Sequence, residues 1–167
     1  MGSNTPIVRQ TAWISIIPQI SFMTLLFIFW WQLGFQNPFI IGALHYLAIS
    51  WTLRLTIPRF HRKGIKLVKQ KKFEEAIVLF EKSHHFFTKY NWIDRFRYLT
   101  LLSSSRYCYK EMAMTNIAYC YGQIGKGELC VKYYEQVLEK YPNNGIAQAA
   151  INFYNSTQEK KEDESGK

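Results

Sequence analysis

The chain contains 44 consecutive residues without a charge, between Arg9 and Arg54. As one continuous helix this stretch would be about 66 Å long, roughly twice the thickness of the hydrocarbon core of a bilayer. Turn chemistry interrupts it near Gly34, where an Asn37-Pro38 pair follows. We therefore predict a hairpin of two transmembrane helices, at residues 12–33 and 39–57, within an N-terminal domain of residues 1–58.

Aromatic and basic residues lie near the ends of both predicted spans, where side chains of these kinds favour the membrane–water interface. The long side chain of Arg54 is expected to reach the lipid headgroups from the end of the second span. Two alternatives stay open: a buried helical hairpin in a soluble core, and a shallow hairpin within one leaflet. The expected interface residues are Trp13, Trp30, Trp31, Arg54, Arg59, Arg62 and Lys63.

The formal net charge of +9 comes entirely from the first 73 residues. They contain nine of the Lys and Arg residues and no Asp or Glu, whereas 12 basic and 12 acidic residues follow. Because the loop between the spans has no Lys or Arg, the positive-inside rule predicts an integral membrane protein with both termini cytoplasmic. The basic run from Arg59 to Lys72 is expected to face lipid headgroups rather than nucleic acid, because apolar residues interrupt it at helical spacing.

Beyond about Phe60 the apolar residues follow the periodicity of helices, which predicts a cytoplasmic helical domain over residues 59–157. Residues 158–167 are mostly charged and include Ser and Gly, so we expect a disordered tail there. The predicted fold class is all-α: a two-span hairpin followed by a short stack of antiparallel helix pairs.

Small and aromatic residues recur in two segments of this helical domain. The residues are Ala76 and Phe80 in the first segment, and Ala118, Tyr121, Cys130, Tyr134 and Pro142 in the second. The pattern resembles the tetratricopeptide repeat (TPR), a helix–turn–helix unit of about 34 residues. The resemblance implies that these residues pack between helices, with copies at residues 57–90 and 111–144 and a cap helix at 145–157.

Proteins with such repeats bind peptides or partner helices in a concave groove, so the resemblance implies a protein partner. This face is mildly polar and aromatic, which suits an apolar peptide or helix. Two repeats and a cap are near the lower limit for a stable stack, so we also expect support from the intervening segment, the membrane or self-association. The register places His61, Met112, Thr115, Asn116, Tyr119 and Gln123 in the groove.

Ala76 and Cys130 are 54 residues apart, about 20 more than one repeat. The additional residues fall in an aromatic-rich segment at about Lys89–Tyr109. Two interpretations are open for it. The segment extends the helices under the first pair, or it lies on the membrane with Arg95, Arg97 and Arg106 at headgroup level.

The sequence contains no catalytic constellation, phosphate-binding loop or metal-ligand spacing that points to an enzyme, so we expect no cofactor and no metal. The three cysteines form no C-x-x-C pair and are expected to be core thiols. His45 is a polar residue within a predicted span. We expect it to hydrogen-bond to Gln19 or Ser21, because unpaired polar groups there are costly.

These features predict a non-catalytic, membrane-anchored adaptor or scaffold whose repeats recruit a protein. The alternative is a small structural subunit or assembly factor of a larger membrane complex. In that case the hairpin would make the main contacts, through Gly42, Ala43, His45 and Ala48.

Overall fold

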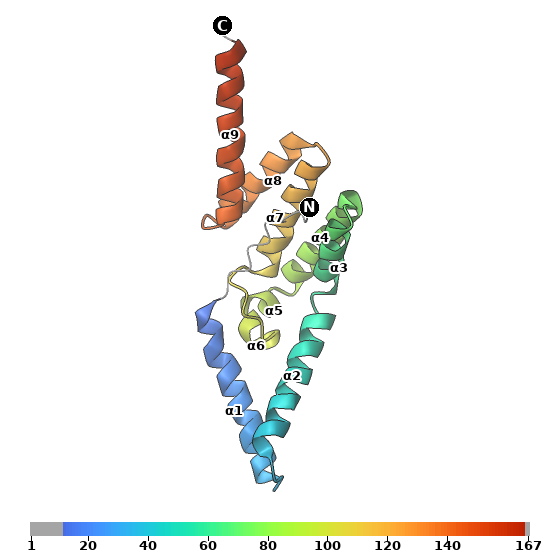
Figure 1. Cartoon of the computed structure of the whole chain (residues 1–167), viewed down its shortest axis with the longest axis vertical. Coiled ribbons are helices and arrows are strands. Elements are labelled where there is room, and N and C mark those ends of the chain that lie inside the picture. Colours follow the sequence, from blue (N-terminus) through green and yellow to red (C-terminus); the bar gives the residue numbers. More distant parts are fainter. Residues whose placement is uncertain (1–11, 166–167) are drawn as a thin grey trace. The chain divides into compact units, whose positions relative to one another are not determined.

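The computed structural model describes residues 12–165, and side chains as far as Thr157. Every regular element in these residues is a helix (Figure 1), as the predicted all-α class requires. The chain divides into two compact units. The hairpin unit comprises residues 12–59 together with Phe87–Cys108, and the helix-pair unit comprises Phe60–Phe86 and residues 109–165.

The hairpin unit begins with the short 3-10 helix η1 (Trp13–Ser15), followed by α1 (Ile16–Gln32) and α2 (Pro38–Thr56). When η1 and α1 are counted together, the bounds of both helical segments agree with the predicted spans, 12–33 and 39–57, to within one residue. Both prolines are placed where a helix tolerates them. Pro18 lies in the first turn of α1 and Pro38 is the first residue of α2, so neither removes a hydrogen bond from a helix interior.

The helices α1 and α2 form a hairpin (Figure 1) and pack closely at Gly42. A Cβ atom at this position would lie 3.3 Å from the backbone nitrogen of Phe27. A small residue therefore allows the two backbones to approach, as is common where helices pack in membranes.

The segment Phe87–Cys108, here called the insertion, contains two short helices, α5 (Asn91–Arg95) and α6 (Arg97–Thr100). They lie between the open ends of α1 and α2 in Figure 1, and the insertion belongs to the same compact unit as these helices. This differs from the expectation that the segment extends the helices under the first pair.

The helix-pair unit contains α3 (Arg59–Lys69) and α4 (Phe73–Lys89), then α7 (Tyr109–Gln123) and α8 (Gly127–Lys140). Its first core cluster brings together Val68 of α3, Phe80 of α4 and Ile117 of α7. Gly64 permits this packing, because a Cβ atom there would lie 2.7 Å from the buried ring of Phe80.

The two helix pairs repeat one local structure at an offset of 54 residues, since α3 and α7 end, and α4 and α8 begin, at this spacing. The turn also repeats, because Lys71 and Gly125 adopt positive φ angles of 61° and 75°. In each turn the next amide donates to the carbonyl five residues earlier: Lys72 to Leu67 at 3.0 Å, and Lys126 to Tyr121 at 2.9 Å.

The last helix, α9 (Gly145–Ser165), is longer than the predicted cap helix. Its start packs on α7 and α8 in a second core cluster that includes Met114, Tyr134 and Ala147. It then continues through residues 158–165, for which we expected disorder. The Glu, Gln and Lys residues that suggested a solvated tail also have high helix propensity. Residues 166–167 lie outside the described part of the chain.

A buried hydrogen-bond network fixes the start of α9. The Asn144 amide donates to Glu111 Oε1 at 3.0 Å and to Thr115 Oγ1 at 3.2 Å, and Asn144 Oδ1 accepts from the Ala147 amide at 2.9 Å. Asn144 is thus the N-cap of α9 and also joins this helix to α7.

Replacing Asn144 by Ala should lower the free energy of unfolding by about 1–3 kcal/mol, because a cap is lost and the buried Glu111 loses a donor. The measurement is chemical denaturation of the full chain in detergent. Asn143→Ala, at the exposed neighbouring position, is the matched control and should change stability little. Equal effects of the two substitutions would contradict the role given to Asn144.

Candidate functional site

The surface of the hairpin is unusually apolar. The helical segments Trp13–Gln32 and Pro38–Thr56 are long and apolar enough to cross a membrane, and only a small share of their residues is buried within the protein. The exposed side chains include Leu25, Phe29, Leu44, Leu47 and Trp51. Large apolar patches of this kind on a protein surface indicate contact with lipid or another protein.

The three tryptophans expected at the interface differ in their surroundings. Trp13 is 82% exposed and Trp31 is 65% exposed. Trp30 is half-buried instead, because its ring lies 5.0 Å from that of Phe35 and 5.8 Å from that of His45, measured between centroids. Trp30 therefore contributes to packing within the hairpin, and its predicted place at the interface stays a prediction.

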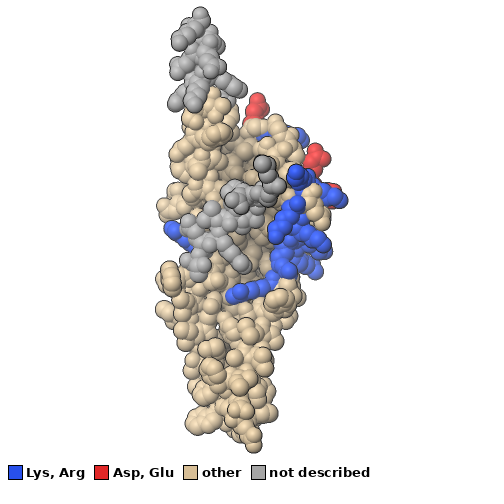
Figure 2. All heavy atoms as spheres, viewed as in Figure 1, with Lys and Arg blue, Asp and Glu red and all other residues tan. Residues whose placement is uncertain are grey.

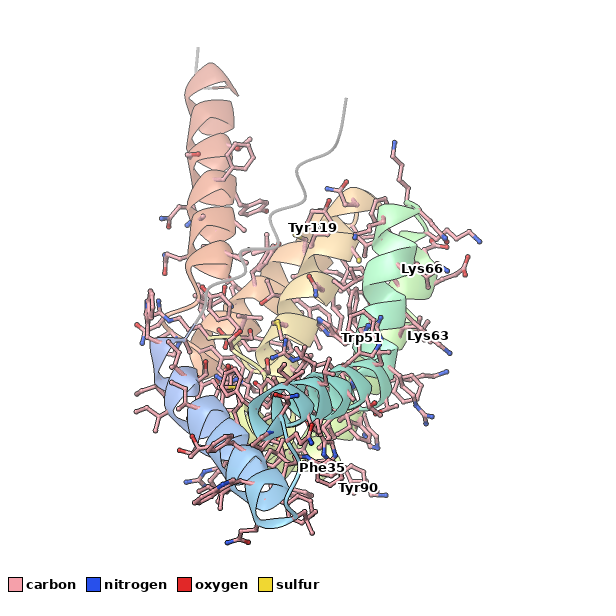
Figure 3. The ribbon with its side chains drawn as sticks, turned by 60° about the horizontal axis from the view of Figure 1, so that its bottom comes forward. Phe35, Trp51, Lys63, Lys66, Tyr90 and Tyr119 are labelled. Carbon is pink, nitrogen blue, oxygen red and sulfur yellow. The ribbon has the colours of Figure 1, made fainter. Side chains whose placement is uncertain are left out.

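The helix α3 has one basic face and one buried face. Arg59, Arg62, Lys63 and Lys66 are exposed, whereas Gly64 and Val68 face the core. Figure 3 shows Lys63 and Lys66 pointing away from the ribbon. On the face visible in Figure 2, Lys and Arg side chains gather over α3. Since α3 begins three residues after α2 ends, this cationic face directly follows the apolar hairpin.

One backbone carbonyl of the insertion joins the two long helices of the hairpin. The carbonyl oxygen of Leu102 accepts a hydrogen bond from Gln19 Nε2 of α1 at 3.2 Å and another from the Arg54 guanidinium of α2. The Ala12 amide adds a third bond, to the carbonyl of Ser104 at 2.8 Å. We call the two bonds to Leu102 the Leu102 clasp.

The insertion is also stabilised internally. The Arg97 guanidinium donates to the carbonyls of Ser105 at 3.1 Å, Arg106 at 2.6 Å and Asp94 at 3.3 Å. Leu101 and Leu102 of the insertion are buried. The guanidinium of Arg97 therefore binds backbone carbonyls within the insertion.

The clasp involves two polar residues of the hairpin. Arg54 binds the carbonyl of Leu102 in the insertion, an interaction that was not predicted from the sequence. Gln19 is likewise engaged with Leu102, and Ser21 donates to the carbonyl of Ile17 at 2.9 Å, so neither is the predicted partner of His45. His45 packs against Trp30 instead.

The predicted groove residues separate into a buried pair and a surface stripe. Met112, Asn116 and Tyr119 are half-buried and Gln123 is exposed, all on one face of α7 at helical spacing. Tyr119 also packs on Phe73, with 6.3 Å between ring centroids.

The other two groove residues are buried, so the prediction that they contact a partner is wrong. Thr115 receives the Asn144 amide described above. His61 lies between the rings of Phe80 and Tyr109, at centroid distances of 5.3 and 5.4 Å. Other helices cover both residues. The groove was predicted from the residue positions within one repeat, and these positions do not tell which helices pack on it.

The residues assigned to repeat packing are mostly internal. Ala76, Phe80, Ala118 and Tyr134 are buried, while Tyr121 and Cys130 are half-buried. Pro142 lies in the turn between α8 and α9 and is exposed. The prediction that it packs between helices is therefore wrong. Burial raises the pKa of the Cys120 thiol to about 12, so at neutral pH this residue is a protonated core side chain.

No family model, curated protein or solved structure matches the chain in comparisons with known proteins. The TPR resemblance therefore remains a prediction from the residues quoted above. The clasp itself was missed by sequence reasoning, because its acceptor is a backbone carbonyl. The sequence signals that could have suggested it are Gln19 within one span and Arg54 near the end of the other.

The buried His61 gives a prediction about pH. Desolvation lowers the pKa of His61 from 6.5 to about 4, so the unfolded chain takes up this proton more readily than the folded one. The stability linked to His61 should be full above pH 6.5 and be lost as the pH falls towards 4, by about 3 kcal/mol at most.

His61→Phe should reduce this loss of stability, because the aromatic contacts stay and the titrating group is removed. The measurement is the difference between variant and unmodified protein in unfolding free energy at pH 7 and pH 4.5. The exposed His85, changed to Phe, is the control. An identical pH dependence in the His61 variant and the unmodified chain would exclude this role for His61.

The clasp gives a prediction about local stability. Arg54→Gln shortens the donor that reaches Leu102, so the insertion should open more often and trypsin should cut after Arg95 and Arg106 several-fold faster. Cleavage in detergent is followed by mass spectrometry. Arg59→Gln, on the exposed face of α3, is the control. If both variants are cut at the same rate in the insertion, the clasp does not hold it.

Proposed function

We propose that this protein is a non-catalytic, membrane-anchored adaptor. In this proposal α1 and α2 cross the bilayer, and the helix-pair unit recruits a protein on the cytoplasmic side. The observation that carries the proposal is the joining, in one chain, of a charge-free hairpin with an apolar surface to helix pairs that repeat at a fixed offset.

The anchoring part is supported by length, surface and charge. Each long helix would extend about 30 Å, which matches the thickness of the hydrocarbon core. The basic face of α3 follows the second helix, and cations there are attracted to anionic headgroups by about 1 kcal/mol each. Because the loop between the helices has no Lys or Arg, the open end of the hairpin is assigned to the cytoplasm.

The adaptor part is supported by the repeated helix pairs and by the stripe on α7. Repeats that stack in pairs offer an extended surface for peptides or helices, and this property is shared by many unrelated processes. Asn116 and Gln123 supply amide groups at the two sides of Tyr119, which suits an apolar peptide whose backbone needs hydrogen-bond partners.

The test combines chemical crosslinking in the native membrane with purification from detergent. Replacing Asn116 and Gln123 together by Ala should lower partner recovery several-fold, because their amides are removed while Tyr119 and its packing on Phe73 are kept. The control is Lys132→Ala with Glu135→Ala, two exposed residues of α8. If partner recovery is unchanged in both double variants, the stripe on α7 does not bind the partner. If alkaline carbonate releases the chain from the membrane, α1 and α2 do not anchor it.

A second candidate function is supported by the clasp. An anchor alone needs no segment bound between its spans, yet the insertion and both helices form one compact unit. This suits a structural subunit of a membrane complex in which the hairpin unit makes the main contacts. Of the contact residues expected, Gly42 is occupied within the hairpin and His45 is half-buried, whereas Ala48 is exposed. Exchanging α1 and α2 for an unrelated two-span anchor separates the candidates, because only the adaptor keeps its function.

A further inference from the structure

We propose that the insertion is a third membrane-contacting element, whose apolar face enters the lipid at the level of the headgroups and the adjoining acyl chains. The face consists of Trp92, Phe96 and Leu99. This inference rests on the proposed function, since it requires that α1 and α2 cross the bilayer.

Three large apolar side chains of the insertion are exposed to the surroundings. Trp92 of α5 is 59% exposed, Phe96 between the two short helices is 52% exposed, and Leu99 of α6 is 60% exposed. The rest of the insertion shows that this exposure is selective, because Leu101, Leu102 and Tyr107 are buried. The insertion thus has an internal apolar core and a separate external apolar face.

The attachment points of the insertion set its level in the membrane. The Ala12 amide binds Ser104, and the exposed Trp13 follows immediately. Arg54 lies in the last turn of α2, and Gln19 lies about 9 Å along the helix from Trp13. These are positions at the open end of the hairpin, within the zone where tryptophan side chains prefer to lie.

Several polar backbone groups of the insertion are hydrogen-bonded within the protein, as an environment with little water requires. Irregular backbone is tolerated at membrane depth only when its polar groups have partners within the protein. Arg97 binds three carbonyls, and the Leu102 carbonyl has two donors. Thr100 Oγ1 donates to the carbonyl of Ile93 at 2.7 Å. These bonds give several backbone carbonyls of the insertion partners within the protein.

The exposed charges of the insertion match a lipid surface. Its one acidic residue, Asp94, is buried, whereas Lys89, Arg95 and Arg106 are exposed. The cation of Arg95 lies 5.8 Å from the ring centre of Phe96, and that of Lys89 lies 5.6 Å from that of Tyr90, which points outward in Figure 3. Aromatic rings beside cations are typical of the headgroup region, so the occupant we assign to this face is a bilayer with anionic lipids.

The test places a photoreactive benzoylphenylalanine at one of three exposed phenylalanine positions of the full chain. The chain is reconstituted in vesicles of phosphatidylcholine and phosphatidylglycerol, and lipid adducts are measured by mass spectrometry. Phe96 tests the inference. Phe29, exposed on α1, reports whether the hairpin enters the bilayer. Phe153, exposed on α9 in the other unit, measures background.

The inference expects several-fold more lipid adduct at Phe96 than at Phe153, and an adduct at Phe29 as well. Adduct at Phe29 with only background at Phe96 overturns the inference and leaves the anchor standing. Background at both positions overturns the proposed function itself. Crosslinking of Phe96 to another protein or to a second copy, with no lipid adduct, also overturns the inference.

A second measurement needs no photoreactive group. Trp92→Phe removes one of the five tryptophans, and the difference in fluorescence between the two chains reports on Trp92. In vesicles with lipids brominated near the headgroup, the Trp92 contribution should be quenched more strongly than with bromines at the acyl-chain ends. If neither brominated lipid quenches the Trp92 contribution, and the Trp92→Phe variant is fully folded, the inference is wrong.

Discussion

The carbonyl of Leu102 receives a hydrogen bond from each of the two long helices, through Gln19 and Arg54. A buried carbonyl without a partner costs free energy, and two donors remove that cost while joining three segments that are distant in the sequence. The charged donor contributes most, since hydrogen bonds from a guanidinium are stronger than those from an amide. The open end of the hairpin is therefore defined by this acceptor, whereas its closed end is defined by the turn near Gly34.

The two units are stabilised in different ways. In the helix-pair unit, small residues such as Ala76 and Gly64 let helices approach, and Phe80 fills the space between them. In the hairpin unit most large apolar side chains are exposed, so its packing depends on the contact at Gly42 and on polar bonds to the insertion. An apolar surface of this kind is stable where water is excluded. The bilayer required by the proposed function would therefore also stabilise this unit.

The sequence predicted those features that have a signature in side-chain pattern. The two long apolar helices follow from the lack of charge between Arg9 and Arg54, and the helix pairs follow from the recurrence of small and aromatic residues such as Ala76 and Cys130. The features it did not predict depend on contacts between distant segments. Burial of His61 requires Tyr109 from another helix, and the clasp uses a backbone atom of Leu102, which any residue would supply. The continuation of α9 was missed because charged residues suit both a solvated tail and an exposed helix.

The placement of the insertion has a consequence for dividing the chain. Because the insertion belongs to the hairpin unit, the backbone within residues 12–165 passes between the units three times, at Arg59–Phe60, at Phe86–Phe87 and at Cys108–Tyr109. A truncated chain that begins at residue 60 would keep the insertion and lose its binding partners on α1 and α2, exposing Leu101 and Leu102. A short linker in place of residues 87–108 would be needed to obtain the helix-pair unit alone. The two units thus cannot be obtained separately by one cut in the sequence.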